Sequence, residues 1–428
     1  MKWPGWTAPC KPMLSDRFAT DLNKLHPFPP AMTIGLAVSG GGDSMALLDL
    51  AAEWAAPRSV NLKVASVNHG LRPDAAAEIA LVAARCHALG LSHETLDWED
   101  NGQSGNLQAN ARQARQRLIN NWAQSHAIKV ILTGHTLDDL GETFLMRLAR
   151  GSGVDGLAAM RKSRLIGDIL WLRPLLGFKR QELRDWLSEN QLTWADDPSN
   201  DDPRFDRVRF RQKMPELAAL GLTPERLSAT AAHMARAAEA LGCQTSELAR
   251  QCATLTPEGA LEIDWKPLRA APDDIQLRLL AGAIRYIAQR PYRPRFDALT
   301  GTFEALQQGR QKTLAGTVLT LQDATLTIRR EPAAVQETPF APGRLFDNRW
   351  EINGPSGAAA MIRPLRTADM QLIGQSRDPK VSASHILATP AIWQKDELVA
   401  VPTAGIRHKW SNRLVLGTEG FISSLLSH

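Results

Sequence analysis

Two segments of the sequence hold side chains suited to binding phosphate and amine groups. The first, residues 38–48, reads VSGGGDSMALL, in which glycines, serines and an aspartate lie directly before a helical pattern. Glycine lets the backbone approach an anion closely, and the first amides of a helix attract phosphate oxygens. The candidate phosphate-binding residues are Ser39, Gly40, Gly41, Gly42, Asp43 and Ser44.

Asp43 is also the candidate metal ligand. It lies where a phosphate loop that grips terminal phosphates usually carries lysine, and no Gly-Lys dipeptide occurs in the chain. A carboxylate beside phosphates implies a Mg²⁺ ion between the two. The alternative is an ordinary glycine turn whose helix is capped by Asp43 or Ser44.

The second segment, residues 133–143, reads TGHTLDDLGET and follows a predicted strand. Asp139 and Glu142 are three residues apart on the predicted helix, so both carboxylates face the same way. Such a pair suits a substrate that bears two amines, whereas the alternative is acids that merely complement the helix dipole. His135 could donate a hydrogen bond to a phosphate or to an activated base, or it could be structural.

Arginines form two further groups. Arg112 and Arg115 flank the apolar stripe of a predicted helix at 106–125, where they could stabilise charge on a transferring phosphoryl group. The segment PRFDRVRFRQK interleaves cations with two phenylalanines, a pattern that can hold phosphates and stack a base. Its candidate RNA contacts are Arg204, Arg207, Arg209 and Arg211. For both groups the alternative is a solvated helix face.

Predicted strands place both segments at one edge of a sheet. Residues 32–39, 62–68 and 129–134 are apolar or β-branched runs, and helical stretches separate them. This alternation predicts an α/β domain with a doubly wound parallel sheet covered on both faces. Ligands bind at the carboxyl ends of the strands in such sheets, and both segments lie at those ends.

A chain of 428 residues is too long for one ordinary core. We expect a catalytic domain at 1–217, a mainly helical domain at 218–330 and a small β-rich domain at 335–428. Four scattered cysteines indicate a reducing compartment, and no apolar run reaches the roughly 18 residues that span a bilayer. We therefore expect a cytoplasmic protein without a membrane partner. The net charge of +5 permits a polyanionic partner without requiring one.

The string SGGGDS between a strand and a helix resembles the PP-loop of the N-type ATP pyrophosphatases, which transfer AMP from ATP to an oxygen. Further segments follow in the order of one family, the tRNA(Ile)-lysidine synthetases. These are VNHGLRPDAA, ANARQARQRL, LTGHTLDDLGETFLMRLARGSGVDGLAAM, and WLRPLL followed by DDPSNDDPRFDRVRFRQKMPEL. The resemblance is strong over residues 31–217 and weak beyond them. It implies an adenine nucleotide alpha-hydrolase-like fold, and the missing lysine fits chemistry at the α-phosphorus.

The resemblance implies a two-step reaction on cytidine 34 of an isoleucine tRNA whose anticodon is CAU. ATP with Mg²⁺ adenylates the C2 oxygen of the base, and the ε-amine of free L-lysine then attacks C2 and expels AMP. Asp139 and Glu142 would hold the lysine, and the two later domains would bind the tRNA. Arg147 and Arg150 match a family segment near the target nucleotide. Gln116, Thr136 and Val208 replace the residues that the family usually has there.

Two rival interpretations stay open. A tRNA thiolase shares the loop, although no cysteine is placed for sulfur handling and Cys86 falls on a predicted helix. A non-catalytic tRNA-binding homologue would keep only a degenerate loop, against which the complete set of Ser39, Asp43, Asp139 and Glu142 argues. The oligomeric state and the tRNA features that are recognised are also left open.

Overall fold

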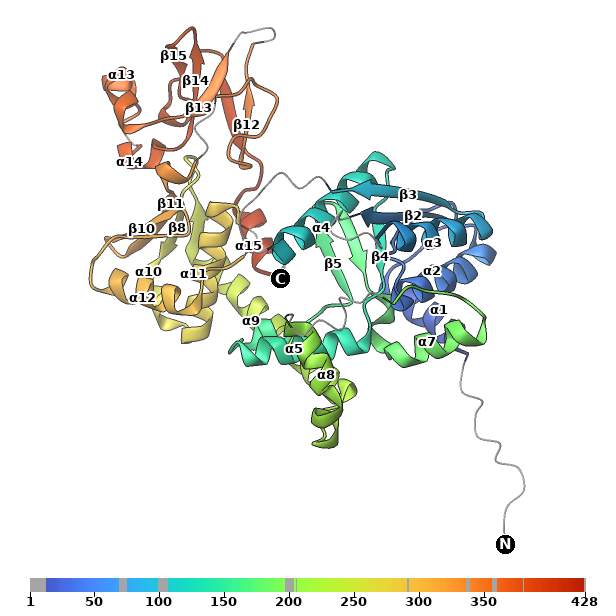
Figure 1. Ribbon diagram of the computed structural model, residues 1–428. Coiled ribbons are helices and arrows are strands. Elements are labelled where there is room, and N and C mark those ends of the chain that lie inside the picture. The colour runs from blue at the N-terminus through green and yellow to red at the C-terminus, as the bar shows by residue number, and fades with distance from the viewer. Residues whose placement is uncertain are drawn as a thin grey trace. The chain divides into compact units, whose positions relative to one another are not determined.

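The computed structural model describes residues 13–68, 75–98, 107–196, 204, 206–290, 292–335, 339–355, 360–379 and 381–426. The chain divides into two compact units, Met1–Arg236 and Ala237–His428 (Figure 1). The division falls inside the long helix α9, Pro224–Cys252. The three-domain division expected from the sequence stays a prediction.

The first unit is built on a six-stranded sheet with the order β3-β2-β1-β4-β6-β5. All neighbours pair in parallel except β5, which runs antiparallel to β6 at one edge. The strands are β1 (Thr33–Ala37), β2 (Asn61–Asn68), β3 (Ser92–Asp97), β4 (Val130–Thr133), β5 (Ser163–Ile166) and β6 (Ile169–Leu172). The strand order reverses between β1 and β4, so the loops after these two strands flank the topological switch point. The predicted doubly wound parallel sheet is confirmed.

Helices cover both faces of this sheet. The helices of this unit are α1 (Leu14–Leu25), α2 (Gly42–Ala55), α3 (Ala75–Ala88), α4 (Leu107–Ser125), α5 (Leu137–Ala149), α6 (Val154–Leu157), α7 (Arg180–Glu189) and α8 (Asp206–Ala219). Successive strand residues point to opposite faces. Val130 and Leu132 of β4 therefore pack with α1, α2, α3 and α7, whereas Ile131 packs with Trp122 of α4.

A smaller core holds α5 beside α8 and the first part of α9. Phe144 and Leu145 of α5 pack with Leu227 and Ala231 of α9, and Met214 of α8 covers the same cluster. Because α5 follows β4 directly, this packing brings α8 to the carboxyl edge of the sheet. Side chains of α8 can therefore reach those of α5.

The second unit combines helices with a small antiparallel sheet. Its helices are α10 (Trp265–Ala270), α11 (Asp273–Ala288), α12 (Phe296–Gln307) and α15 (Thr418–Leu426). A five-stranded sheet of order β7-β8-β11-β10-β9 packs with them. These strands are β7 (Ala253–Leu255), β8 (Leu261–Asp264), β9 (Lys312–Leu314), β10 (Thr317–Gln322) and β11 (Thr325–Arg330). β10 and β11 form an antiparallel hairpin.

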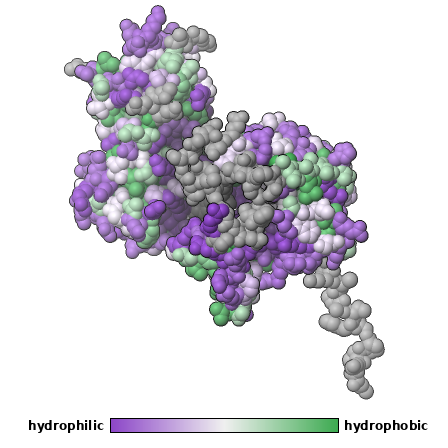
Figure 2. Space-filling model, viewed as in Figure 1, coloured by the Kyte–Doolittle hydropathy of each residue, from purple (hydrophilic) through white to green (hydrophobic). Residues whose placement is uncertain are grey.

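The end of the chain is β-rich, as expected. Its strands are β12 (Trp350–Asn353), β13 (Met361–Pro364), β14 (Pro390–Gln394), β15 (Glu397–Ala400) and β16 (Ser411–Leu414), with short helices α13 (Met370–Ile373) and α14 (Ala383–Ile386). The face seen in Figure 2 is mainly hydrophilic, with apolar residues scattered over it. Among the described residues, no helix combines the length and apolarity needed to cross a membrane.

Candidate functional site

Hydrogen bonds within the glycine loop fix its conformation between β1 and α2. Gly40 has a φ of 89°, a conformation that favours glycine. The Ser39 amide donates to Ser44 Oγ at 3.1 Å, and Ser44 Oγ donates to the Gly41 carbonyl at 2.8 Å. Gly41 is the N-cap residue, and no side-chain cap hydrogen bond forms there within the described structure. The first amides of α2 are thus suited to phosphate oxygens.

The loop after β4 packs tightly on this glycine loop. A Cβ atom added to Gly134 would lie 2.9 Å from the Asp43 carbonyl oxygen and 3.0 Å from Ser44 Cα. Both atoms belong to the backbone of α2, so neither can swing away. Glycine at position 134 therefore lets the two functional segments meet.

We expect Gly134→Ala to lower the thermal unfolding midpoint and to weaken ATP binding, because the new methyl group must push the α2 backbone aside. Overpacking of this kind typically costs about 1–3 kcal/mol. Gly301→Ala is the matched control, since nothing lies within 4 Å of its added Cβ. Calorimetry and nucleotide titration measure both effects. Equal behaviour of the two variants would contradict the close contact.

Asp139 and Glu142 lie on α5, where Thr136 begins the helix. Thr136 and Asp139 form a capping box, in which the Thr136 amide donates to Asp139 Oδ2 at 2.8 Å. The alternative interpretation, in which the acids of this segment stabilise the start of the helix, is therefore partly correct for Asp139. Its other oxygen, Oδ1, faces away from the cap and accepts hydrogen bonds from arginines. The side chain of Glu142 is only 1% exposed, so its charge must be balanced by neighbours.

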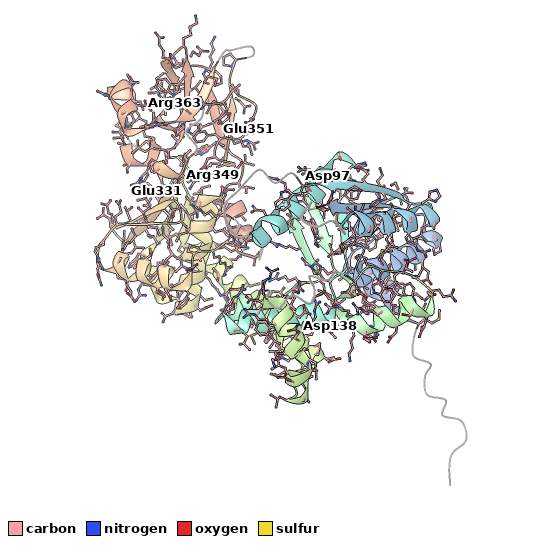
Figure 3. The ribbon with its side chains drawn as sticks, in the orientation of Figure 1. Asp97, Asp138, Glu331, Arg349, Glu351 and Arg363 are labelled. Atoms are coloured by element: carbon pink, nitrogen blue, oxygen red, sulfur yellow. The ribbon has the colours of Figure 1, made fainter. Side chains whose placement is uncertain are left out.

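Arg180, the first residue of α7, joins the two predicted segments. Its guanidinium donates to Asp43 Oδ2 through Nε at 3.1 Å, to Asp139 Oδ1 through Nη2 at 2.8 Å, and to Glu142 Oε1 through Nη1 at 3.3 Å. Its backbone amide donates to Asp138 Oδ2 at 2.7 Å. Asp138 is labelled in Figure 3. The structure thus brings Asp43, Asp139 and Glu142 around one side chain.

Two arginines of α8 complete this cluster. Arg207 donates to Glu142 Oε2 at 2.6 Å and to Asp139 Oδ1 at 2.9 Å. Arg211 donates to Glu142 Oε1 at 2.8 Å. Arg207 and Arg211 were expected to contact RNA, and that expectation stays a prediction. In this structure their guanidinium groups contact the carboxylates of α5.

Electrostatics distinguish the titratable groups of the cluster. Burial raises the pKa of Asp43 to about 6; Arg180 opposes this shift and Asp139 adds to it. Burial also opposes ionisation of Asp139, but Arg207 and Arg180 outweigh it and lower the pKa of that carboxyl. Burial lowers the pKa of His135 to about 3, so its ring is neutral at physiological pH. A neutral imidazole can donate one hydrogen bond and accept another.

Asp43 fits the Mg²⁺ ion that the sequence implied. Its Oδ1 is buried and has no hydrogen-bond partner in the described structure. A buried, unpartnered carboxylate oxygen with a raised pKa gains from a cation nearby. Within the described residues, no group of three or more His, Cys, Asp or Glu side chains could hold a metal ion.

The remaining predicted residues lie around this cluster or on α4. His135 Nδ1 is 3.0 Å from Thr133 Oγ1. Arg147 donates to the carbonyls of Gly156 and Ala159 at 2.7 and 2.9 Å, so it stabilises the turn around α6. Arg115 is exposed on α4, whereas the side chain of Arg112 lies outside the described residues.

The remaining candidate RNA contacts are Arg150, Arg204 and Arg209. Arg150 donates to Asp206 Oδ2 at 2.9 Å, and Arg209 also pairs with Asp206. Arg204 is exposed. These residues are accessible at the surface, as an RNA contact requires.

Arg180 is the functional residue that sequence reasoning missed. It lies in GFKRQEL, which reads as an ordinary amphipathic helix start. Its contact with Asp43 joins residues 137 positions apart, and no local pattern encodes such a distance. The preceding WLRPLL segment, which matched the family, was the signal nearest to it.

Two of the described cysteines lie in hydrophobic cores, whereas Cys243 is exposed on α9. Cys86 and Cys252 are buried in separate hydrophobic cores. Burial raises the pKa of each thiol to about 11, which disfavours the reactive thiolate. Cys86 lies on α3, as its predicted helical position indicated.

Comparisons with known proteins agree with this geometry. Residues 14–217 match a family model described as a PP-loop domain. A tRNA(Ile)-lysidine synthase from Ruegeria pomeroyi is 40% identical over 399 residues, which cover 93% of this chain and 95% of that protein. Another from Wolbachia pipientis wMel is 33% identical over 390 residues, which cover 89% of this chain and 90% of that protein.

Solved structures with a similar fold are more distant. A U34-tRNA thiolase from Methanococcus maripaludis, determined with its 4Fe-4S cluster, has a TM-score of 0.45 and 15% sequence identity. The match covers 52% of this chain and 78% of the thiolase.

Proposed function

This chain belongs to the tRNA(Ile)-lysidine synthase family, and we propose from that premise that it joins free L-lysine to cytidine 34 in the CAU anticodon of an isoleucine tRNA. It is an ATP-dependent ligase that modifies tRNA. The proposed location is the cytoplasm, where tRNA and ATP are available together.

The proposed reaction has two steps. The C2 oxygen of the cytidine attacks the α-phosphorus of ATP, a new O–P bond forms, and the bond to pyrophosphate breaks. The ε-amine of lysine then attacks C2, a C–N bond forms, and the C–O bond to AMP breaks while the amine loses a proton. The products are lysidine in the tRNA, AMP and pyrophosphate.

The residues present suit the first step. The α2 amides and the hydroxyls of Ser39 and Ser44 would bind the phosphates of ATP. Mg²⁺ held by Asp43 would offset the negative charge that builds up on the leaving pyrophosphate. The ring of His135 is neutral and interacts electrostatically with Asp139. It would hydrogen bond to the nucleotide or to the base. Arg112 and Arg115 remain the proposed partners of the transferring phosphoryl group.

The second step needs a place for a cationic amino acid. Asp139 and Glu142 supply adjacent carboxylates at the end of β4, the strand beside β1. We assign the lysine ammonium group to them, and Arg147, Arg150, Arg204, Arg207, Arg209 and Arg211 to tRNA binding. The observation that carries this proposal is the convergence of Asp43, Asp139 and Glu142 on one guanidinium. This convergence supports a single site for the acid assigned to the nucleotide and the acids assigned to the amine.

Mass spectrometry of the tRNA nucleosides tests the proposed function. After incubation with isoleucine tRNA bearing CAU, ATP, Mg²⁺ and lysine, we expect cytidine 34 to gain lysine, with one AMP and one pyrophosphate formed per tRNA. A methionine tRNA with the same anticodon is the matched control, and it should stay unmodified. Sulfur incorporation would support the thiolase instead. Binding of tRNA without pyrophosphate release would support the non-catalytic homologue.

A further inference from the structure

Arg180 is the element of the site that the proposed function leaves without a role. It contacts the proposed metal ligand Asp43 and both proposed lysine ligands, Asp139 and Glu142. Arg207 and Arg211 pair with the carboxylates of α5. The Arg180 guanidinium therefore occupies positions that two different cationic ligands would need.

Because of charge balance, the Arg180 guanidinium and a cationic ligand would compete for the same carboxylates. In the contacts described above, three carboxylates face three guanidinium groups. Glu142 is 1% exposed and already accepts hydrogen bonds from all three arginines. An ammonium group can reach this carboxylate only if one of these donors leaves. Arg180, with a side chain 17% exposed, is the donor whose departure would also free Asp43.

The backbone and the side chain of Arg180 are held by different contacts. The backbone amide of Arg180, at the start of α7, donates a hydrogen bond to Asp138 of α5. The side chain makes three separate single hydrogen bonds at 2.8 to 3.3 Å, one to each acid. When a ligand binds one of these acids, Arg180 loses one hydrogen bond. The other two hydrogen bonds then break at a lower free-energy cost, and the other two acids become available to a second ligand.

Resting on the proposed function, we infer that Arg180 is a positioning residue that couples the nucleotide site to the lysine site. Mg²⁺ with ATP takes Asp43 from the Arg180 guanidinium, and the guanidinium then yields Asp139 and Glu142 to the lysine ammonium. Coupling of this kind is reciprocal, so lysine also tightens the binding of Mg²⁺ and ATP by the same factor. Lysine therefore binds well only after the nucleotide is in place.

The test measures the Kd of L-lysine by equilibrium dialysis, with and without Mg²⁺ plus an ATP analogue whose α–β bridge cannot be cleaved. For the unmodified protein we expect the analogue to tighten lysine binding at least about 5-fold, the lower end of typical coupling. Arg180→Gln should bind lysine more tightly than the unmodified protein without nucleotide, and the analogue should change its Kd less than about 2-fold.

Arg211→Gln is the matched control, because it removes one positive charge next to Glu142 without touching Asp43. It should shift the Kd of lysine but keep the coupling factor. Arg180→Lys guards against misfolding of the glutamine variant: a lysine keeps the positive charge but lacks the planar guanidinium that spans all three acids, so its coupling should be intermediate. Thermal unfolding checks that each variant is folded.

The outcomes separate this inference from the proposed function. An unchanged coupling factor in folded Arg180→Gln and Arg180→Lys would overturn the role of Arg180 alone. If Glu142→Gln left the Kd of lysine unchanged in the presence of the analogue, the proposed lysine site itself would be wrong, and the inference would fall with it.

Discussion

Replacement of Asp43 by asparagine is expected to slow adenylation of the tRNA at least about 10²-fold, the effect typical of losing a contact that stabilises transition-state charge. Asp43 has one oxygen paired with Arg180 and one buried oxygen without a partner. Asparagine keeps the size of the side chain, and its amide oxygen can still accept from Arg180. It lacks the negative charge that a Mg²⁺ ion requires.

Pyrophosphate release in the absence of lysine measures this first step alone. Glu53→Gln is the matched control, because Glu53 is an exposed acid on the same helix, and we expect its rate to be unchanged. Raising the Mg²⁺ concentration should not rescue Asp43→Asn, since the ligand itself is missing. A folded Asp43→Asn variant with a near-normal rate would show that the metal is held elsewhere.

The sequence predicts those parts of the site that depend on residues close together in the chain. The SGGGDS loop and the spacing of Asp139 and Glu142 both depend on residues a few positions apart, read against strand and helix periods. The strand order then brings β1 beside β4, so the loops after these two strands share the carboxyl edge at which ligands bind. This rule therefore predicts the position of both segments from local patterns alone.

The missed features depend on contacts between distant segments. Nothing near Arg180 indicates that its side chain reaches Asp43, because the packing of α7 against α2 decides it. The pairing of Arg207 and Arg211 with Glu142 likewise depends on the core that holds α8 beside α5. Short strands such as β7 and β9, three residues each, carry too few side chains to reveal a period.

Glu142→Gln is expected to separate the two chemical steps. Glutamine keeps the length of the side chain and can accept hydrogen bonds from the arginines, but it removes the negative charge that would hold the lysine ammonium. Glu142 makes no contact with the phosphate loop in the described structure except through Arg180. Lysine transfer should therefore slow at least about 10²-fold, whereas adenylation should change much less. Adenylated tRNA should accumulate.

Single-turnover assays can follow both steps in one reaction, with pyrophosphate release reporting adenylation and AMP release reporting lysine transfer. Glu216→Gln is the matched control: Glu216 is an exposed acid of α8 that pairs with Lys213, outside the cluster, so both rates should stay normal. Very high lysine concentration should partly restore transfer by Glu142→Gln, because Asp139 remains to hold the amine. Equal loss in both steps would instead place Glu142 with ATP and Mg²⁺, and the lysine site would then lie among other residues.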